Sequence, residues 1–66
     1  MEATNPQRLA YRVPRAADFI DVSRAQLYKL IGEGEIDVIR VGRAIRVPHD
    51  SLLAFVERKK AEAKAA

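Results

Sequence analysis

Residues 22–31 have the sequence VSRAQLYKLI, which predicts a short helix with a hydroxyl cap. Ser23 is a preferred N-cap residue, because its hydroxyl can accept a hydrogen bond from a free amide of the first turn. Gln26 follows three residues later and completes the pattern of a capping box. Gly32 and Gly34 come directly after the stretch, and glycine takes the left-handed conformation in which many helices end. Local sequence therefore predicts both ends of this helix.

The predicted helix has one apolar face and one polar, basic face. At about 100° per residue, Leu27, Leu30 and Ile31 share one side, and we expect that side to be buried. The residues expected opposite and on the flanks are Arg24, Ala25, Gln26, Tyr28 and Lys29. Such a surface suits a DNA groove, but it equally suits the solvent-facing side of any small domain. Tyr28 has a second option, because its ring can fold back onto the core.

Residues 13–20 predict another short helix directly before the capped one. Pro14 suits the first helical position, where its missing amide costs nothing. Val13, Ala17 and Ile20 have the i, i+4, i+7 spacing of a buried face, and we expect Phe19 to pack beside them. Two short helices separated by so few residues are typical of a helix-turn-helix.

Residues 37–47 change to the two-residue period of β-strands. Gly42 and Arg43 separate two short runs, which predicts a β-hairpin with a tight turn. An isolated hairpin is marginally stable, so we expect its aliphatic face to pack against the helices. The predicted aliphatic face consists of Ile39, Val41, Ile45 and Val47, and the outward face of Val38, Arg40, Ala44 and Arg46. Beside a helix-turn-helix, such a hairpin is a wing.

Residues 48–60 predict the last helix, with Pro48 at its first position and Asp50 in its first turn. Its expected apolar edge consists of Leu52, Phe55 and Val56, with Leu53 alongside. Together these elements predict an α+β, mostly helical fold, a winged helix-turn-helix domain over residues 11–60. We expect a flexible N-terminal arm at residues 1–10 and a fraying tail at residues 61–66.

Length and composition restrict the class of protein. A chain of 66 residues forms one small domain with a simple core, and the absence of cysteine excludes disulfides and thiolate metal sites. Lys and Arg number 12 against 9 Asp and Glu, and 8 of the 12 are Arg, which favours bidentate contacts with phosphate and guanine. Without an apolar run of membrane-spanning length or a signal-peptide pattern, we expect a soluble cytoplasmic protein.

The residues do not form a pattern expected of an enzyme, a metal site or a cofactor site. His49 is the only histidine, and we interpret it as a surface residue at a helix start. The acidic residues near the second helix lack the spacing of a calcium loop; they are Asp18, Asp21, Glu33, Glu35 and Asp37. The three glycines do not form a phosphate-binding loop. We therefore expect no catalysis, no cofactor, no metal and no small-molecule substrate.

Two predicted elements point independently to double-stranded DNA. On the helix, Gln26 suits an adenine edge and Lys29 a guanine edge, while Arg24 and Tyr28 are better placed for phosphates. On the hairpin, the candidates are Arg40, Arg43 and Arg46.

The three hairpin arginines have separate interpretations. Arg43, at the turn, suits the negative potential of a minor groove. Arg46 can contact a phosphate or pair with Glu33 or Glu35. The alternative for all three arginines is a solvated strand face that discourages edge pairing.

Several segments, taken in order, resemble the excisionase-type winged helix-turn-helix domain, a relative of the MerR-type DNA-binding domain. They are Val13-Pro14, Ala17, Val22-Ser23, Tyr28-Lys29-Leu30-Ile31, Gly34-Glu35-Ile36, Arg40-Val41-Gly42-Arg43, Arg46-Val47-Pro48 and Leu52. The resemblance covers residues 11 to about 57 and implies a second helix in the major groove and a wing at an adjacent minor groove. By position, the matching residues are Ser23, Arg24, Tyr28 and Lys29 on the helix and Arg43 and Arg46 on the wing.

The resemblance also implies a function. Excisionases of phages and mobile elements, or recombination directionality factors, bind adjacent sites, bend DNA and direct an integrase towards excision. The implied partners are double-stranded DNA, an integrase and neighbouring copies of the chain. MerR-type regulators continue into a long dimerisation helix and an effector domain, so we do not expect an effector-sensing regulator. A small transcriptional regulator of the same fold stays open, and so does a protein-interaction adaptor that uses the hairpin edge.

Overall fold

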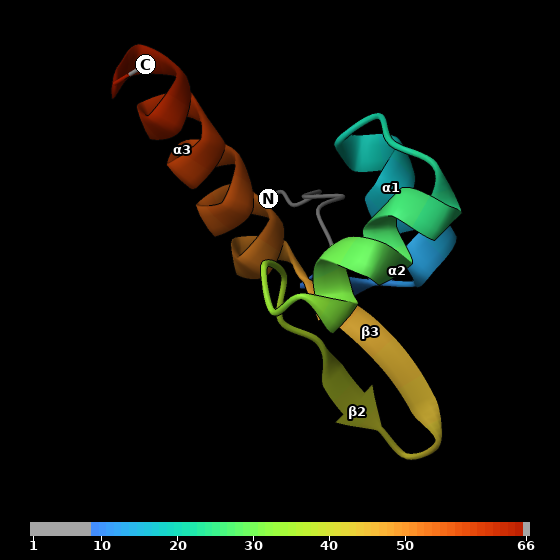
Figure 1. Ribbon diagram of the computed structural model, residues 1–66. Coiled ribbons are helices and arrows are strands. Elements are labelled where there is room, and N and C mark those ends of the chain that lie inside the picture. Colours follow the sequence, from blue (N-terminus) through green and yellow to red (C-terminus); the bar gives the residue numbers. More distant parts are fainter. Residues whose placement is uncertain (1–8, 66) are drawn as a thin grey trace, which may run out of the picture.

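The computed structural model describes residues 9–65, which form three helices and three strands (Figure 1). In chain order the elements are β1 (Ala10–Tyr11), α1 (Val13–Phe19), α2 (Arg24–Gly32), β2 (Ile39–Val41), β3 (Ala44–Pro48) and α3 (His49–Ala65). The prediction of an α+β, mostly helical fold is confirmed. The predicted N-terminal arm lies almost entirely outside the described residues.

Helices α1 and α2 pack against each other and are joined by a short turn. Ala16 and Ala17 of α1 are almost completely buried, and their small side chains let the two helices approach closely. In the turn, Asp21 has a φ of 57°, a left-handed conformation that Asp tolerates better than most residues. The amide of Val22 then donates to the carbonyl of Ala17 at 3.0 Å and fixes the entry into α2.

Both ends of α2 follow from its local sequence. At the start, the Ser23 hydroxyl accepts a hydrogen bond from the Gln26 amide at 3.0 Å, as predicted for an N-cap. At the end, Gly34 has a φ of 78°, and its amide donates to the carbonyl of Ile31. The amide of Glu35 donates to the carbonyl of Leu30, which completes a Schellman motif.

Removing the cap of α2 is expected to destabilise the protein. Ser23→Ala leaves the Gln26 amide without its partner and should lower the free energy of unfolding by about 1 kcal/mol. Ser23→Asp keeps an acceptor at the N-cap and should retain the stability of the natural chain. Thermal melts followed by circular dichroism compare the three proteins, and an unchanged Tm for Ser23→Ala would contradict the capping role.

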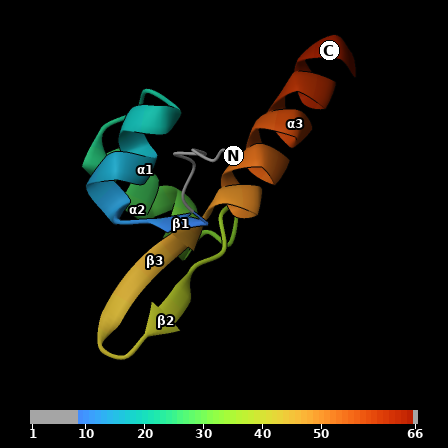
Figure 2. The same cartoon turned by 180° about the vertical axis from the view of Figure 1, so that it is seen from behind.

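The sheet has three antiparallel strands in the order β1-β3-β2 (Figure 2). Strand β1 was not predicted, because two residues are too few to show a periodic pattern. Ala10 pairs with Pro48 and Tyr11 with Val47, and the His49 amide donates to the carbonyl of Leu9 at 2.8 Å. The start of the described chain is thus fixed to the junction between β3 and α3.

The hairpin forms where predicted, but the prediction of its two faces is wrong. Arg40 pairs with Ile45 and Val41 with Ala44 across a turn in which Gly42 has a φ of 64°. Paired residues share a face, so an odd-numbered residue of one strand lies beside an even-numbered residue of the other. The four residues of the predicted aliphatic face are all odd-numbered and divide between the faces: Ile39 and Val41 lie with Ala44 and Arg46, while Ile45 and Val47 lie with Arg40.

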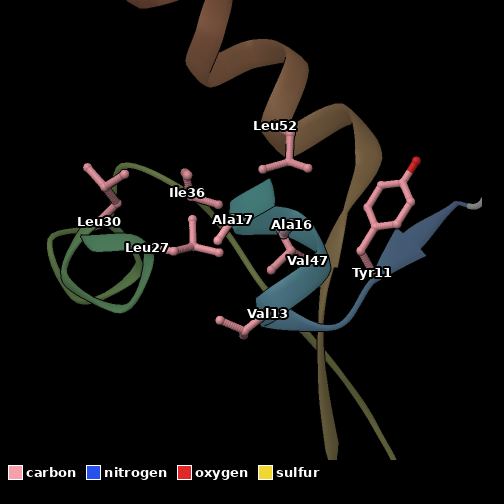
Figure 3. Close-up of a cluster of buried hydrophobic side chains, with 9 residues drawn as sticks. All are labelled: Tyr11, Val13, Ala16, Ala17, Leu27, Leu30, Ile36, Val47 and Leu52. Carbon is pink, nitrogen blue, oxygen red and sulfur yellow. The ribbon is translucent and has the colours of Figure 1, made fainter. Parts of the chain in front are cut away.

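A single apolar core lies between the helices and the base of the sheet (Figure 3). Its buried residues are Tyr11, Val13, Ala16, Ala17, Leu27, Leu30, Ile36, Val47 and Leu52. Figure 3 shows Leu27 and Leu30 entering from α2, Tyr11 from β1 and Leu52 from α3. The predicted buried side of α2 is confirmed, with Ile31 packed partly against the core.

Helix α3 begins one residue later than predicted and continues to Ala65. Pro48 ends β3 instead of opening the helix. Of the predicted apolar edge only Leu52 is buried; Phe55 is partly buried, and Leu53 and Val56 are exposed. In Figures 1 and 2, α3 and the hairpin extend from opposite ends of the core.

Candidate nucleic-acid interface

The polar residues predicted on α2 all lie on its exposed side. Ser23, Arg24, Gln26, Tyr28 and Lys29 are exposed, while Leu27 and Leu30 are buried. Two buried leucines thus fix the rotation of the helix about its axis. The result is a surface that combines a guanidinium, an amide, a phenol and an ammonium group.

Tyr28 had two predicted positions, and the structure decides between them. Its side chain is 57% exposed, so the ring does not fold back onto the core. The phenol is therefore available to a partner, together with the cationic groups of Arg24 and Lys29 on the same exposed side.

The hairpin does not present its arginines on one face, which corrects the predicted outward arginine face. Arg40 shares a face with Ile45, and Arg46 lies on the opposite face beside Ile39. Arg43 lies in the turn and is exposed. The two-residue turn produces this division, because it pairs each odd-numbered residue of one strand with an even-numbered residue of the other. The hairpin therefore carries cationic groups on both faces and at its tip.

Arg46 does not pair with Glu33 or Glu35, an option that the sequence left open. Its guanidinium donates to the carbonyl of the adjacent Ile45 at 2.9 Å. Glu35 instead accepts from Arg58 of α3 at 3.1 Å, and the same guanidinium donates to the Glu35 backbone carbonyl at 2.6 Å. The segment after α2 is thereby joined to α3.

His49 lies at the start of α3, as predicted, but it is not the surface residue that we predicted. Its ring is partly buried, and its Nδ1 lies 2.8 Å from the hydroxyl oxygen of Tyr11. Tyr11 is 4% exposed, and its ring also packs against Phe19 with 4.6 Å between centroids. Because this contact joins β1 to the start of α3, it gives His49 a structural role that needs no catalysis.

The described residues offer no metal site of the usual kind. Within residues 9–65, no three side chains of the His, Cys, Asp and Glu types come together as a metal would require. Across the same residues, the structure contains no helix with the length and apolarity needed to cross a membrane.

Two arginines that the sequence analysis did not include among the candidates lie close to Arg46. Arg12 and Arg15, at the start of α1, line a surface concavity together with Arg46 of β3. Only tertiary structure brings these positions together, since 30 residues of sequence lie between Arg15 and Arg46. The signal available in the sequence was the run of basic residues Arg8, Arg12 and Arg15 at the entry to the domain.

A known domain family matches most of the fold just described. The family model described as "Helix-turn-helix domain" matches residues 10–60. This chain is a member of that helix-turn-helix family. The matched region begins with β1 and extends into α3, so the helix-turn-helix domain includes the sheet and the core as well as α1 and α2.

Relatives of this helix-turn-helix protein have longer chains. It is 33% identical over 61 residues to the "Probable excisionase" of Saccharopolyspora erythraea, covering 92% of this chain and 62% of that protein. It is 34% identical over 55 residues to "Uncharacterized protein Rv2310" of Mycobacterium tuberculosis, covering 83% of this chain and 48% of that protein. The chain thus spans from about half to three fifths of the length of these relatives. No solved structure is a significant match.

Proposed function

We propose that this helix-turn-helix protein is an excisionase that binds attachment-site DNA and directs an integrase towards excision. In this proposal α2 enters the major groove, and the β2–β3 hairpin acts as a wing at the adjacent minor groove. The observation that carries the proposal is the exposed side of α2, where Arg24, Gln26, Tyr28 and Lys29 stand clear of the core. Membership of the helix-turn-helix family supports DNA as the partner.

The exposed polar side chains of α2 have proposed roles. Gln26 pairs with an adenine edge and Lys29 with a guanine edge, because an amide and an ammonium match those donor and acceptor patterns. Arg24 and Tyr28 contact phosphates at the edge of the groove, and Ser23 lies at the start of the same surface. Base contacts of this kind supply specificity, while the phosphate contacts fix the position of the helix.

The hairpin supplies the second group of proposed contacts. Arg43 at the turn enters the minor groove, where negative potential favours a guanidinium. Arg40 and Arg46 lie on opposite faces of the hairpin, so they reach phosphates on the two sides of that groove. In this proposal the hairpin acts as the wing of a MerR-like domain, which the sequence resembles.

The excisionase role is supported by the "Probable excisionase" of Saccharopolyspora erythraea, which aligns with 92% of this chain. A domain with one short α2 and one hairpin makes few contacts, so we propose that several copies bind adjacent sites and bend the DNA between them. An integrase bound beside them is the proposed protein partner.

Salt dependence is the first test of DNA binding. If about five cationic groups neutralise phosphates, a plot of log K against log salt concentration should have a slope of about −4 to −5. Gel shifts and fluorescence anisotropy on random duplex DNA measure that slope. Failure to retard duplex DNA at low salt would contradict the proposal and favour a protein-interaction adaptor.

A matched pair of variants locates the interface. Replacing Arg24, Lys29 and Arg43 together by glutamine should make the slope of log K against log salt concentration shallower by about three. The control replaces Lys59, Lys60 and Lys64 of α3 by glutamine, which removes the same charge from the other end of the molecule and should leave the slope unchanged.

A recombination assay separates an excisionase from a transcriptional regulator of the same fold. Added to an integrase and the two attachment sites that flank an integrated element, the protein should increase excision. In the reverse reaction, it should suppress integration. Fluorescence energy transfer between the ends of the same duplex should increase as the DNA bends. Binding without bending or excision would favour the regulator, and an integrase gene beside the gene for this chain would identify the integrase to use.

A further inference from the structure

A concavity at the start of α1 is lined by three arginines from distant parts of the chain. Its volume is about 400 Å³, and Arg12, Arg15 and Arg46 line it with Ala10 and Tyr11. Figures 1 and 2 both show the first turn of α1 beside β3, and the two elements are in contact. The concavity therefore opens between the helix-turn-helix and the hairpin.

The sheet places Arg46 at this concavity. Tyr11 and Val47 are paired and point into the core, so their neighbours along each strand point to the opposite face. Arg46 and Ala10 are two of those neighbours. The guanidinium of Arg46 is thus held on the outer face, where β1 ends and α1 begins.

Arg12 and Arg15 occupy positions that local helix energetics disfavour. Arg12 is the N-cap residue of α1 but forms no cap hydrogen bond through its side chain. Arg15 lies in the first turn, which contains no acidic residue. The start of a helix favours Ser, Thr, Asp or Asn at the cap and negative charge in the first turn, because the helix dipole is positive there. Residues that act against a local rule in this way are expected at functional sites.

The described residues that line this concavity include three arginines and no carboxylate, while Asp18 lines the neighbouring concavity with Arg12 and Arg15. Among the ion pairs of residues 9–65, none involves Arg12, Arg15 or Arg46. Arginines that line one concave surface offer the fork geometry that binds phosphate oxygens, although one guanidinium N–H of Arg46 already donates to the Ile45 carbonyl. The chemistry that fits is a phosphate group with at least one negative charge.

We propose that this concavity binds a backbone phosphate of the DNA, as a contact separate from those of α2 and the hairpin tip. The proposal rests on the proposed DNA binding, because a free phosphate ion has the same chemistry. It assigns Arg12 and Arg15 to the interface and makes Arg46 part of a three-arginine site. In the free protein, the positive charge of Arg12 and Arg15 then destabilises the start of α1. When the phosphate binds, its negative charge compensates that positive charge.

The double variant Arg12→Ser/Arg15→Gln tests the proposal with two opposite effects. A serine at position 12 can cap α1, so Tm should rise by about 4–8 °C. The salt slope for duplex DNA should become shallower by about one, because one phosphate contact is lost. The control Lys60→Gln/Lys64→Gln removes the same charge from α3 and should leave the slope unchanged.

Neutral methylphosphonate groups identify the phosphate itself. Single substitutions are scanned along a duplex selected for tight binding to the natural chain. The position that weakens the natural chain but no longer weakens the double variant is the phosphate held by the concavity. Titration with inorganic phosphate, followed by the arginine side-chain NMR signals, separates the DNA backbone from a free ion.

The outcomes are distinct. A shallower slope in the double variant alone, with one methylphosphonate position losing its effect, supports the proposal. An unchanged slope overturns it, and so does an equal change in the lysine control. Signals that shift with inorganic phosphate while the DNA slope stays unchanged overturn the DNA assignment and leave a free-phosphate site. If the natural chain does not bind duplex DNA at all, the proposed function fails first, and the phosphate titration still reports on the concavity.

Discussion

In the Leu27→Ala variant, a large fraction of the molecules is expected to be unfolded at 37 °C. Leu27 has no exposed surface and lies at the centre of the contact between α2 and the rest of the core (Figure 3). Truncating a buried leucine costs about 2–5 kcal/mol, from lost burial and from the cavity left behind. A domain of 66 residues has a total stability of about 3–10 kcal/mol, so this loss is a large fraction of the total.

Thermal and urea unfolding of Leu27→Ala measure the effect, with a decrease in Tm of at least about 10 °C. Leu53→Ala removes the same atoms from a side chain that is 52% exposed and should change stability by less than about 0.5 kcal/mol. A similar Tm for both variants would show that Leu27 is not part of the core.

Lys29→Ala is expected to weaken binding to preferred DNA sites by about 1–3 kcal/mol, or roughly 5-fold to 150-fold. The proposed contact of its ammonium group with a guanine edge exists only where that guanine is present. Random duplex DNA should therefore lose much less affinity. Sites selected from a random duplex library, compared with unselected duplexes by anisotropy at one salt concentration, measure the difference.

Arg43→Ala provides the contrast for Lys29→Ala. If Arg43 in the minor groove contacts phosphates alone and no base edge, its loss should weaken binding to all sequences about equally, with a salt slope shallower by about one. Lys29 also lies in the last turn of α2, where its charge favours the helix dipole, so circular dichroism must confirm that each variant is folded. Equal losses for both variants on every sequence would refute the proposed division between base and phosphate contacts.

The two short helices and their limits could be predicted from the sequence because the responsible interactions are local. Ser23 caps α2 through a residue three positions away, and Gly34 ends it through bonds that span five residues or fewer. The buried side of α2 follows from the spacing of its leucines. These features need no information about the rest of the chain.

The register of the hairpin could have been predicted from the two-residue turn in its sequence, but the prediction used only the alternation along each strand. Gly42 and Arg43 form a two-residue turn, and such a turn pairs Val41 with Ala44. Applying that register assigns Ile39 and Ile45 to opposite faces, whereas alternation read along each run separately placed them together. Alternation gives the two faces of one strand, and only the register relates those faces between strands.

Other features required the tertiary structure. Strand β1 exists because Tyr11 pairs with Val47 across the fold, and its two residues carry no pattern of their own. The exposure of Tyr28 depends on how α2 packs on the core, with Leu27 and Leu30 buried and Tyr28 outside. The meeting of Arg12, Arg15 and Arg46 depends on how α1 packs against β3.

By itself, the sequence determined two short helices, the second of them capped by Ser23, a hairpin, a third helix and a basic, polar side on α2. The tertiary structure decided which cationic groups lie together. It placed Arg40 and Arg46 on opposite faces of the hairpin, and it placed Arg46 at the same concavity as the start of α1. The physical reason is the range of the interactions. Caps and turns act within about five residues, whereas the proposed phosphate site depends on side chains that only the packing of α1 against β3 brings together.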